Sequence, residues 1–558
     1  MARKNRYSAQ RLSIAFLAAL MLPVLILAFI EKQPFGVTIV GILLPLGFYS
    51  LFATLSRRSG RMVWLGLIFV FFSAFQIVIS YLFGESVISA AMFLNLLTTN
   101  SDEASELLGD IYPAVIVVCV LYIPLLWRSA VHLHHKVVLN DSWRRGLAIV
   151  GSTSLAVSCL VLWVGYSGAA KAILRDKVFP VNVCYNLALS ISEVQKIKHY
   201  DITSRGFAYN AEREAIVANR EVYVLVIGEA SRAANWQLYG YSRPTNPKLA
   251  SRNDICIFDG VTTQCNATHK SVPMMLSSVS ASQHYQLYLR SGLPALFNEV
   301  GFTTYFISNQ SPQGAMIDNL VADAHRVVYI PTPHYDGQMV EVMHKAMRTD
   351  PSPRILFIIH SYGSHFSYHQ RYPRNFAMFL PDDDVAISSQ NVSIIRNAYD
   401  NSILYTDYVL NEIISLLESY PTLCSAMFYC SDHGEDLFDN DSGRFLHSSL
   451  NVTYYQLHVA SFAWFSSNYR SSFGDKVAAA VANRRAPATT RSVFHTMADM
   501  ASISSPYVDC GASLLSREFD YSAPRLYLDD HNKAVVLDDN IGIDYLQREL
   551  FRRSGVDL

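Results

Sequence analysis

Polar residues that could bind a metal ion or act as a nucleophile follow short apolar runs in the second half of the chain. They are Glu229 after 222–227, Thr268 after 255–262, His365 after 355–359, the group Asp432, His433 and Glu435 after 426–429, and His447 further along. Zinc is held in proteins by histidine nitrogen and carboxylate oxygen atoms. A hydroxyl beside such an ion becomes more acidic and can act as a nucleophile. The pattern therefore predicts a metal enzyme with a hydroxyl nucleophile.

The elements that must position these residues are short apolar strands that alternate with helices. Candidate strands are 222–227, 303–307, 355–359, 426–429 and 459–465, and the segment 393–419 has helical periodicity. Apolar runs of this length between helices are typical of buried parallel strands in an α/β sandwich. In such sheets the active site lies beyond the carboxyl ends of the strands, where the polar residues are found.

Each candidate also has a purely structural interpretation. Glu229 could cap a following helix, because acidic residues favour helix N-termini. Thr268 could be a turn residue, and Ser271 could be the nucleophile instead. Asp432 and His433 could form a buried hydrogen-bonded pair without a metal. Their occurrence together at several strand ends favours metal binding.

Three further histidines lie near the same strand ends. His269 is expected to be an exposed neighbour of the nucleophile rather than a metal ligand. His360 directly follows an apolar strand and could be either a core histidine or a site residue. His458 precedes a buried strand and could line the pocket.

The first 170 residues are much more apolar than the rest of the chain. Five uncharged runs are found, at 12–30, 33–56, 62–84, 111–127 and 146–170. A helix that spans a membrane needs roughly 20 apolar residues, with about 17 as a lower limit. The chain is therefore predicted to be a multi-pass membrane protein with five spans. Because four more spans follow the first run, a cleaved signal peptide is disfavoured.

The orientation follows from the positions of lysine and arginine. Basic residues occur before the first span and in the loops 57–61 and 128–145, whereas the acidic loop 85–110 has no lysine or arginine. Positive loops remain on the cytoplasmic side. The N-terminus is therefore predicted to be cytoplasmic, and the segment after the fifth span to lie outside.

Three parts are predicted along the chain: a transmembrane domain at 1–170, a linker at 171–220 and a catalytic domain at 221–558. Within the linker, 185–197 is expected to be an amphipathic helix, either along the membrane surface or as an ordinary connection.

The net charge of −1 gives no reason to expect a nucleic-acid partner. Six of the eight cysteines would face an oxidising space, so some disulfides are expected.

Several segments of the chain resemble a known family, in the family's order. They are 226–232 (VIGEASR), 239–246 (YGYSRPTN), 265–273 (CNATHKSVP), 363–365 with 371–373, 431–435 (SDHGE), and 95–103 in the acidic loop. Together they resemble the bacterial inner-membrane phosphoethanolamine transferases of the alkaline phosphatase/sulfatase superfamily. The resemblance implies five transmembrane helices followed by a periplasmic α/β sandwich of the alkaline phosphatase/sulfatase type.

The resemblance also implies roles for individual residues. Glu229, Thr268, Asp432 and His433 would hold one zinc ion, and Thr268 would take the phosphoethanolamine group covalently. Residues near the phosphoryl group or a second zinc ion would be His365, Glu435 and His447. Residues that seat the lipid donor would be Asn95, Thr99 and Glu103.

The implied reaction moves phosphoethanolamine from phosphatidylethanolamine, a membrane lipid, to a lipopolysaccharide acceptor. The acceptor could be lipid A, a core sugar or a periplasmic glucan. Other interpretations are a glycerol-phosphate transferase of the lipoteichoic acid type and an inactive membrane-anchored binding protein. A sulfatase is disfavoured, because the chain has no Cys/Ser-x-Pro-x-Arg motif.

The chain departs from the family in two places. Met274 stands where many relatives have a cysteine that brackets the nucleophile loop, so that disulfide is not expected. The usual lysine near the phosphoryl group is missing around 309–319, and Lys270 or Gln313 could replace it.

Overall fold

The computed structural model describes residues 2–31, 33–84, 87–98, 101–215, 217–312, 315–331, 335–439, 443–537, 543, 545–556 and 558, with the backbone alone for 2–7, 98 and 101–110. The chain divides into two compact units. The first comprises Met1–Phe93 and Glu103–Ile191, and the second comprises Leu94–Asp102 and Ser192–Leu558.

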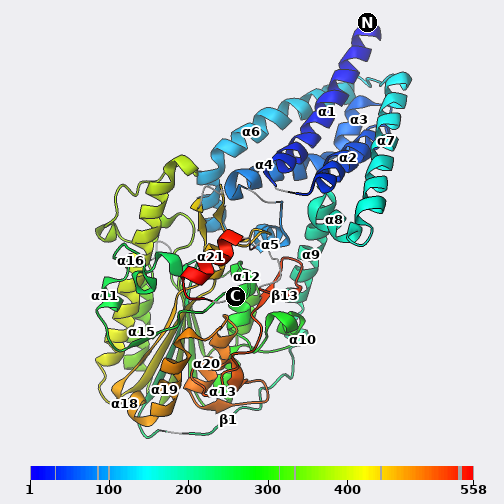
Figure 1. Cartoon of the computed structure of the whole chain (residues 1–558). Coiled ribbons are helices and arrows are strands. Elements are labelled where there is room, and N and C mark those ends of the chain that lie inside the picture. The colour runs from blue at the N-terminus through cyan, green and yellow to red at the C-terminus, as the bar shows by residue number, and fades with distance from the viewer. Residues whose placement is uncertain are drawn as a thin grey trace. The chain divides into compact units, whose positions relative to one another are not determined.

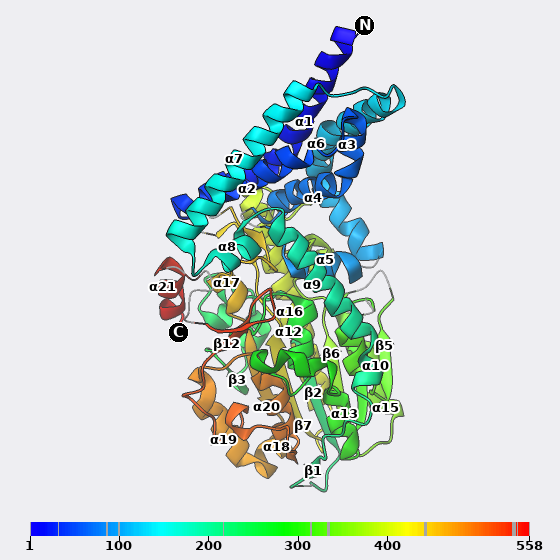
Figure 2. The same cartoon turned by 90° about the vertical axis from the view of Figure 1, so that its right-hand side faces the viewer.

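Helices, most of them apolar, make up the first unit, which is shown in blue and cyan in Figures 1 and 2. They are α1 (Ala2–Ile30), α2 (Phe35–Phe52), α3 (Ser59–Leu65), α4 (Leu67–Phe83), α6 (Ser101–His134), α7 (Asp141–Tyr166) and α8 (Ala170–Lys177). Within the described residues, four helical segments are each long and apolar enough to cross a membrane: Ser8–Ile30, Phe35–Phe52, Ile111–His134 and Asp141–Tyr166. The pair α3 and α4 also qualifies, although it is bent by 61°. The predicted five spans are reached when this bent pair is taken as one span.

Glycines explain two features of these helices. A Cβ on Gly66, at the break between α3 and α4, would lie 2.7 Å from the ring of Phe16. Where α2 meets α7, a Cβ on Gly47 or on Gly151 would lie 3.0 Å from the carbonyl oxygen of the other glycine. Small residues of this kind let membrane helices approach closely.

The predicted linker 171–220 is mostly helical as far as Thr203, and the helix expected at 185–197 is present. Helix α9 (Val181–Lys198) contains the predicted amphipathic segment 185–197, and α10 (Tyr200–Thr203) follows it. Helix α5 (Ala90–Thr98) lies in the acidic loop.

A seven-stranded sheet with the order β3-β10-β7-β2-β6-β4-β5 forms the centre of the second unit. Its strands are β2 (Glu221–Gly228), β3 (Ile255–Ile257), β4 (Thr303–Ser308), β5 (Arg326–Tyr329), β6 (Arg354–His360), β7 (Cys424–Ser431) and β10 (Ser461–Phe465). The run of β2, rich in valine and fully buried, suits a central strand that is covered on both faces. Strands β7, β2, β6, β4 and β5 run parallel, so their carboxyl ends share one edge of the sheet.

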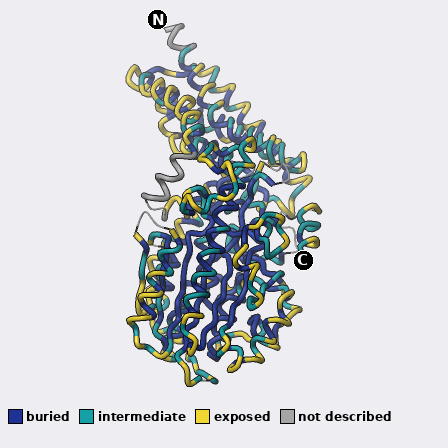
Figure 3. The backbone as a smooth tube through the Cα atoms, turned by 90° about the vertical axis from the view of Figure 1, so that its left-hand side faces the viewer, coloured by how far each residue is buried: buried dark blue, intermediate teal, exposed yellow. Residues whose placement is uncertain are grey.

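Helices cover both faces of the sheet (Figure 1). One face carries α15 (Gly337–Thr349) and α16 (Val392–Glu418), and the other carries α12 (Thr268–Met275), α13 (Leu293–Glu299) and α20 (Ser492–Met500). Apolar side chains of α12, α13 and α20 pack against Tyr223, Leu225 and Leu356 in one large core. Figure 3 shows the strands between these layers in dark blue, the colour of buried residues.

Shorter elements complete the second unit. The helices are α11 (Pro247–Ala250), α14 (Met316–Val321), α17 (Tyr454–Leu457), α18 (Ser467–Ser472), α19 (Gly474–Ala482) and α21 (Tyr545–Arg553). The strands are β1 (Glu212–Arg213), β8 (Asp436–Leu437), β9 (Phe445–Leu446), β11 (Ile503–Ser504), β12 (Leu526–Leu528) and β13 (Ala534–Val536).

The predicted α/β sandwich is confirmed, with one correction. All five predicted strands and the long helix are present within one or two residues of their predicted limits. The prediction of parallel strands is wrong for β10, which pairs antiparallel with both β7 and β3. The apolar run of β10 resembles those of the parallel strands, so its direction could not be read from periodicity.

The expected disulfides are not formed, since all eight cysteines are free. Strand β10 separates Cys256 in β3 from the cysteines of β7, and two strand spacings amount to about 9 Å. A disulfide needs Cα atoms closer than about 7 Å. Cys424 and Cys430 lie six residues apart along β7 and are further separated still.

Candidate metal and nucleophile site

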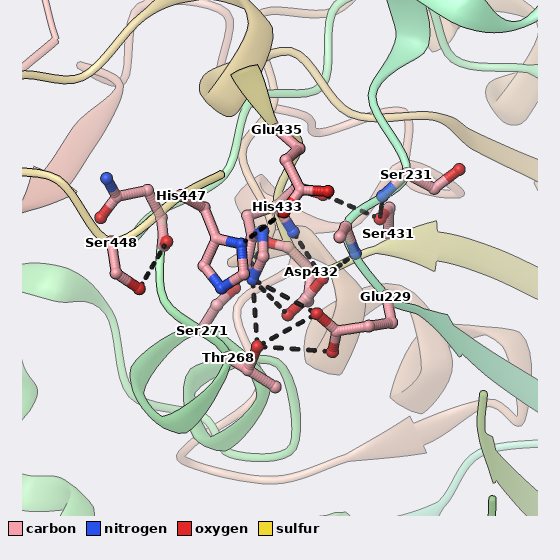
Figure 4. A network of polar contacts seen from close by, with 12 residues as sticks. Glu229, Ser231, Thr268, Ser271, Ser431, Asp432, His433, Glu435, His447 and Ser448 are labelled. Atoms are coloured by element: carbon pink, nitrogen blue, oxygen red, sulfur yellow. Dashed lines mark hydrogen bonds and ion pairs between the residues drawn. The ribbon is translucent and has the colours of Figure 1, made fainter. Parts of the chain in front are cut away.

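Four side chains converge at the carboxyl edge of the sheet (Figure 4). Glu229 follows β2, and Asp432 and His433 follow β7. These two strands are neighbours in register, with Gly228 opposite Ser431, so the next residues emerge side by side. Thr268 is the first residue of α12 and brings its hydroxyl to the same point.

The four side chains are in direct contact. Thr268 Oγ1 lies 3.2 and 3.4 Å from the two carboxylate oxygens of Glu229 and 3.0 Å from Nε2 of His433. The same nitrogen of His433 lies 3.5 Å from Glu229 Oε1 and 3.2 Å from Asp432 Oδ2.

The donor set fits a divalent metal ion. Ligand atoms of Glu229, Asp432 and His433 all lie within 4.8 Å of one another, and all three residues are buried. Oδ2 of Asp432 is buried without a hydrogen-bond partner among the described residues. Two carboxylates, one imidazole and one hydroxyl form a nitrogen and oxygen set that suits zinc.

Burial sets the charges of these groups. It raises the pKa of Glu229 to about 8 and that of Asp432 to about 7, and the neighbouring carboxylate of Asp432 adds to the shift of Glu229. Burial lowers the pKa of His433 to about 4. The cluster on its own therefore retains protons on its carboxylates, and a bound cation would replace them.

Hydrogen bonds around the cluster orient its side chains. Nδ1 of His433 lies 2.9 Å from the carbonyl oxygen of Gly434, so it carries the proton and leaves the lone pair of Nε2 facing the cluster. The side-chain amide of Gln310 donates to Glu229 Oε2 at 3.0 Å and to the carbonyl oxygen of Ser361 at 2.9 Å.

The nucleophile loop is tied to the end of β7 although it lacks the bracketing disulfide. Thr263 and Ser271 both donate their hydroxyl protons to the carbonyl oxygen of Asp432, at 2.5 and 2.7 Å. The hydroxyl of Ser271 is therefore engaged with the backbone, whereas that of Thr268 faces the cluster. This geometry favours Thr268 as the nucleophile.

A second layer of polar groups borders the cluster. The rings of His433 and His447 are 4.1 Å apart, and Nδ1 of His447 lies 3.0 Å from Glu435 Oε1. Tyr368 donates its hydroxyl proton to Glu435 Oε2 at 2.6 Å. Burial raises the pKa of Glu435 to about 8 and lowers that of His447 to about 4.

Other predicted site residues lie at different distances from this cluster. His365 is half-buried, and its pKa is lowered by burial and by Arg371 and His447, which indicates that it lies near the second layer. Lys270 is also buried, but its ammonium group donates to the carbonyl oxygen of Asp530.

Of the predicted lipid-seating residues, the structure describes only the side chain of Asn95. Asn95 is an exposed residue of α5. Thr99 and the side chain of Glu103 fall outside the described residues.

The sequence alone indicates no role for Gln310 or Tyr368. Gln310 lies two residues after β4, so a search of strand ends could have found it. A single glutamine does not by itself indicate a catalytic or metal site, because its side chain is neither titratable nor a nucleophile. Tyr368 begins a short 3-10 helix, and its sequence neighbours give no signal.

Two family models match the chain. One, described as sulfatase, matches residues 221–503. The other, described as phosphoethanolamine transferase EptA/EptB, matches residues 44–193. The chain belongs to the phosphoethanolamine transferases. The resemblance inferred from its motifs is thereby confirmed, and this transferase is an enzyme of the alkaline phosphatase and sulfatase superfamily.

Individual proteins resemble the transferase over much of its length. The protein YhbX of Escherichia coli (strain K12) is 26% identical over 386 residues, 67% of each chain. The Kdo(2)-lipid A phosphoethanolamine 7''-transferase of the same strain is 29% identical over 260 residues, 44% of each chain.

Two solved structures share the fold. The integral membrane lipooligosaccharide phosphoethanolamine transferase A from Neisseria meningitidis has a TM-score of 0.68 and 21% identity, covering 92% of this chain and 97% of that one. The C-terminal periplasmic domain of EptC from Escherichia coli, in complex with Zn, has a TM-score of 0.54 and 22% identity, covering 60% and 98%.

Proposed function

We propose that this transferase moves phosphoethanolamine from phosphatidylethanolamine to lipopolysaccharide, on lipid A or a core sugar, through a phosphothreonine at Thr268. The observation that carries the proposal is the contact of Thr268 Oγ1 with both Glu229 and His433. A related protein named for transfer to Kdo(2)-lipid A supports the acceptor class.

Glu229, Asp432, His433 and Thr268 would hold one zinc ion. His365, Glu435 and His447 would contact the phosphoryl group or a second ion. A bound zinc ion increases the acidity of the threonine hydroxyl and stabilises negative charge on the phosphoryl oxygens. The related EptC domain solved in complex with Zn supports this choice of metal.

In the first half-reaction Thr268 Oγ1 bonds to phosphorus and the ester bond to diacylglycerol breaks. The hydroxyl proton leaves Thr268, and one proton is taken up by the departing diacylglycerol oxygen. Burial holds the pKa of His365 and that of His447 below the usual range, so both imidazoles are neutral. A neutral imidazole would accept the proton from Thr268 and pass it to the departing oxygen. Nδ1 of His365 has no hydrogen-bond partner among the described residues and can take part directly.

In the second half-reaction an acceptor oxygen attacks the phosphothreonine. The bond between Thr268 Oγ1 and phosphorus breaks, the acceptor loses its proton, and the threonine hydroxyl regains one. The same histidines would serve in the opposite direction.

The helices of the first unit would hold the transferase in the inner membrane, beside its lipid donor. We place the N-terminus in the cytoplasm and the catalytic unit in the periplasm, on the basis of the lysine and arginine distribution. Asn95, Thr99 and Glu103, in the loop on the periplasmic side, would help to seat the donor.

The test uses the purified full chain in detergent with zinc, phosphatidylethanolamine and lipid A. We expect diacylglycerol release and a lipid A product heavier by one phosphoethanolamine group. Thr268→Ala should abolish both, whereas Thr349→Ala, at an exposed position on α15, should change neither. Diacylglycerol release by Thr268→Ala at the wild-type rate would refute the proposal.

A further inference from the structure

A long groove lies between α1 and α6 in the first unit. One face of each helix forms its wall, and the lining residues include Arg11, Leu12 and Ala15 of α1 and Leu121, Trp127 and Arg128 of α6. The space between these side chains, counted to the open side, is about 1450 Å³. Sites for drug-sized molecules have volumes of about 300–1,000 Å³, so this groove is large enough for a substantial part of a lipid.

The groove is about as long as one leaflet of a bilayer. At one end the guanidinium group of Arg128 donates to the hydroxyl of Ser8 at 3.1 Å. At the other end, one turn past the groove wall, the hydroxyl of Tyr122 donates to the carbonyl oxygen of Ala19 at 3.1 Å. The helix from Ser8 to Ala19 rises by about 16 Å, at about 1.5 Å per residue. The hydrocarbon core of a bilayer is about 30 Å thick, which gives about 15 Å for each leaflet.

A chain of hydrogen bonds orients Arg128. The hydroxyl of Ser8, which accepts from Arg128, lies 2.9 Å from Nε2 of the buried His132. Nδ1 of His132 lies 2.9 Å from the hydroxyl of Ser59, which donates its own proton to the carbonyl oxygen of Val137 at 3.3 Å. Nδ1 is therefore the donor to Ser59, and Nε2 accepts the proton of Ser8. The lone pairs of the Ser8 oxygen then remain for Arg128.

The two arginines of the groove have no counter-charge in the protein. Among the described residues, neither Arg11 nor Arg128 forms an ion pair, and the groove wall holds no aspartate or glutamate. A charged side chain within a membrane span is costly unless it meets an opposite charge or water. An arginine that served only to set the topology would extend freely to the aqueous surface. Arg128 is instead held beside the groove by Ser8.

The same end of the groove suits the headgroup of a lipid. Trp127, next to Arg128, is 68% exposed, and tryptophan is typical of the membrane interface. Guanidinium groups bind phosphate through two parallel N–H bonds. Leu12 and Leu121 extend the wall towards the other end with apolar surface. Basic pockets between transmembrane helices on the cytoplasmic side bind anionic lipid headgroups.

We propose that this groove binds an anionic phospholipid, with its phosphate between Arg11 and Arg128 and an acyl chain along Leu12 and Leu121. The lipid class follows from the two uncompensated positive charges, because a zwitterionic headgroup brings an ammonium group that both arginines repel. The proposed cytoplasmic N-terminus assigns the lipid to the cytoplasmic leaflet. The site shares no residue with the metal and nucleophile site, so it binds its lipid whether or not the proposed transfer takes place.

The test is a lipid titration of the full chain in detergent, followed by native mass spectrometry. The probes are phosphatidylglycerol and phosphatidylcholine with the same acyl chains. The variants are Arg11→Gln, Arg128→Gln and the double variant. Arg145→Gln is the matched control, because Arg145 is an exposed arginine of α7 outside the groove wall and its replacement removes the same charge. Circular dichroism checks that each variant is folded.

We expect the wild-type protein to bind phosphatidylglycerol about 10-fold more tightly than phosphatidylcholine, and less tightly at high salt. Each single replacement in the groove should weaken the binding of phosphatidylglycerol by about 5-fold, the contribution of one basic residue near a membrane surface. The double variant should bind the two lipids equally. Arg145→Gln should keep the wild-type preference, and the affinity for phosphatidylcholine should change in none of the variants.

Four results would overturn the inference. The first is equal binding of the two lipids by the wild-type protein, a result that needs no variant to fold. The second is a folded double variant that still prefers phosphatidylglycerol. The third is an equal loss in Arg145→Gln and Arg11→Gln, which would show an effect of net charge alone. The fourth is a wild-type dimer that excludes phosphatidylglycerol, which would show that a second copy of the chain covers the groove.

Discussion

At the scale of residues, hydrogen bonds on the outer side of the cluster decide which atoms face the metal position. The carbonyl of Gly434 fixes the tautomer of His433, and the amide of Gln310 holds one oxygen of Glu229. Outer partners of this kind orient ligands and increase metal affinity. Only the inner residues could be predicted from the sequence, because their chemistry is visible without knowledge of the fold. The outer partners are the side chain of Gln310 and the backbone carbonyl of Gly434. They could not be predicted, because their contacts depend on the fold and not on residue type.

Replacing Gln310 should therefore weaken metal binding without removing a ligand. In Gln310→Leu, Glu229 Oε2 loses its amide donor, and zinc affinity should fall by about 10-fold. Competition with a chromophoric chelator measures this change. Gln283→Leu, at an exposed position, is the control and should keep wild-type affinity. Equal affinity in Gln310→Leu and wild type would show that the amide does not position Glu229.

Removal of the metal tests whether the cluster needs zinc for activity. Dialysis against a strong chelator should abolish diacylglycerol release, and added zinc should restore it. Full activity of protein that elemental analysis finds free of metal would contradict the assignment of Glu229, Asp432 and His433 as ligands.

At the scale of elements, the site depends on strand register and on helix starts. Because β2 and β7 are adjacent and in register, the residues after Gly228 and Ser431 meet. The position of this edge follows from the sequence, since apolar runs with polar ends mark parallel strands. The antiparallel direction of β10 and the break at Gly66 did not follow, because neither interrupts an apolar run. They result from tertiary packing.

Buried histidines between elements should make the catalytic unit acid-labile. His458 links α17 to the β3 region: the hydroxyl of Tyr454 lies 3.0 Å from Nδ1, and Nε2 lies 2.8 Å from the carbonyl oxygen of Asp259. Burial lowers the pKa of His458 to about 4, below its usual value of about 6.5. Between these values the unfolded chain binds a proton that the folded chain does not, so stability falls as pH falls.

This histidine should contribute a loss of about 2 kcal/mol between pH 7 and pH 5. His458→Gln should be less stable at pH 7 but should lose less stability on acidification. Denaturant unfolding of the full chain at both pH values measures the difference. His344→Gln, at an exposed position on α15, should retain the wild-type pH dependence. An identical slope in His458→Gln would argue against a neutral buried imidazole.

The close packing of α2 against α7 predicts that a larger side chain at Gly151 will destabilise the protein. Gly151→Val would place a Cβ 2.7 Å from Leu51 and 3.0 Å from the carbonyl oxygen of Gly47. Overpacking of this kind costs about 1–3 kcal/mol, so the melting temperature in detergent should fall. Gly165→Val lies on the same helix, where a Cβ meets nothing within 4 Å, and should have little effect. Equal melting temperatures for the two variants would contradict this packing.

At the scale of the whole molecule, the chain joins a unit of apolar helices to an α/β unit that holds the metal and nucleophile site. The composition of the chain predicts this division, because apolar residues gather in the first 170 positions. The prediction of disulfides was wrong, since the cysteines are free. An oxidising compartment permits disulfides, but the fold keeps the cysteines of its strands apart.

The free thiols allow a test of orientation. Cys510 is exposed in the catalytic unit, so a membrane-impermeant maleimide should label it in cells whose outer membrane alone has been permeabilised. A cysteine introduced by Arg57→Cys, in a loop predicted to be cytoplasmic, should react only after the inner membrane is disrupted. Peptide mass spectrometry identifies each labelled site. The reverse pattern would place the catalytic unit in the cytoplasm.

The covalent intermediate gives the most direct test of the central claim. The full chain is mixed with zinc and phosphatidylethanolamine without an acceptor, quenched in acid, and digested for mass spectrometry. The account predicts one phosphoethanolamine group on the peptide that contains Thr268, assigned to that residue by fragmentation and lost when lipid A is added before the quench. A group on Ser271, or diacylglycerol release with no modified residue, would contradict it.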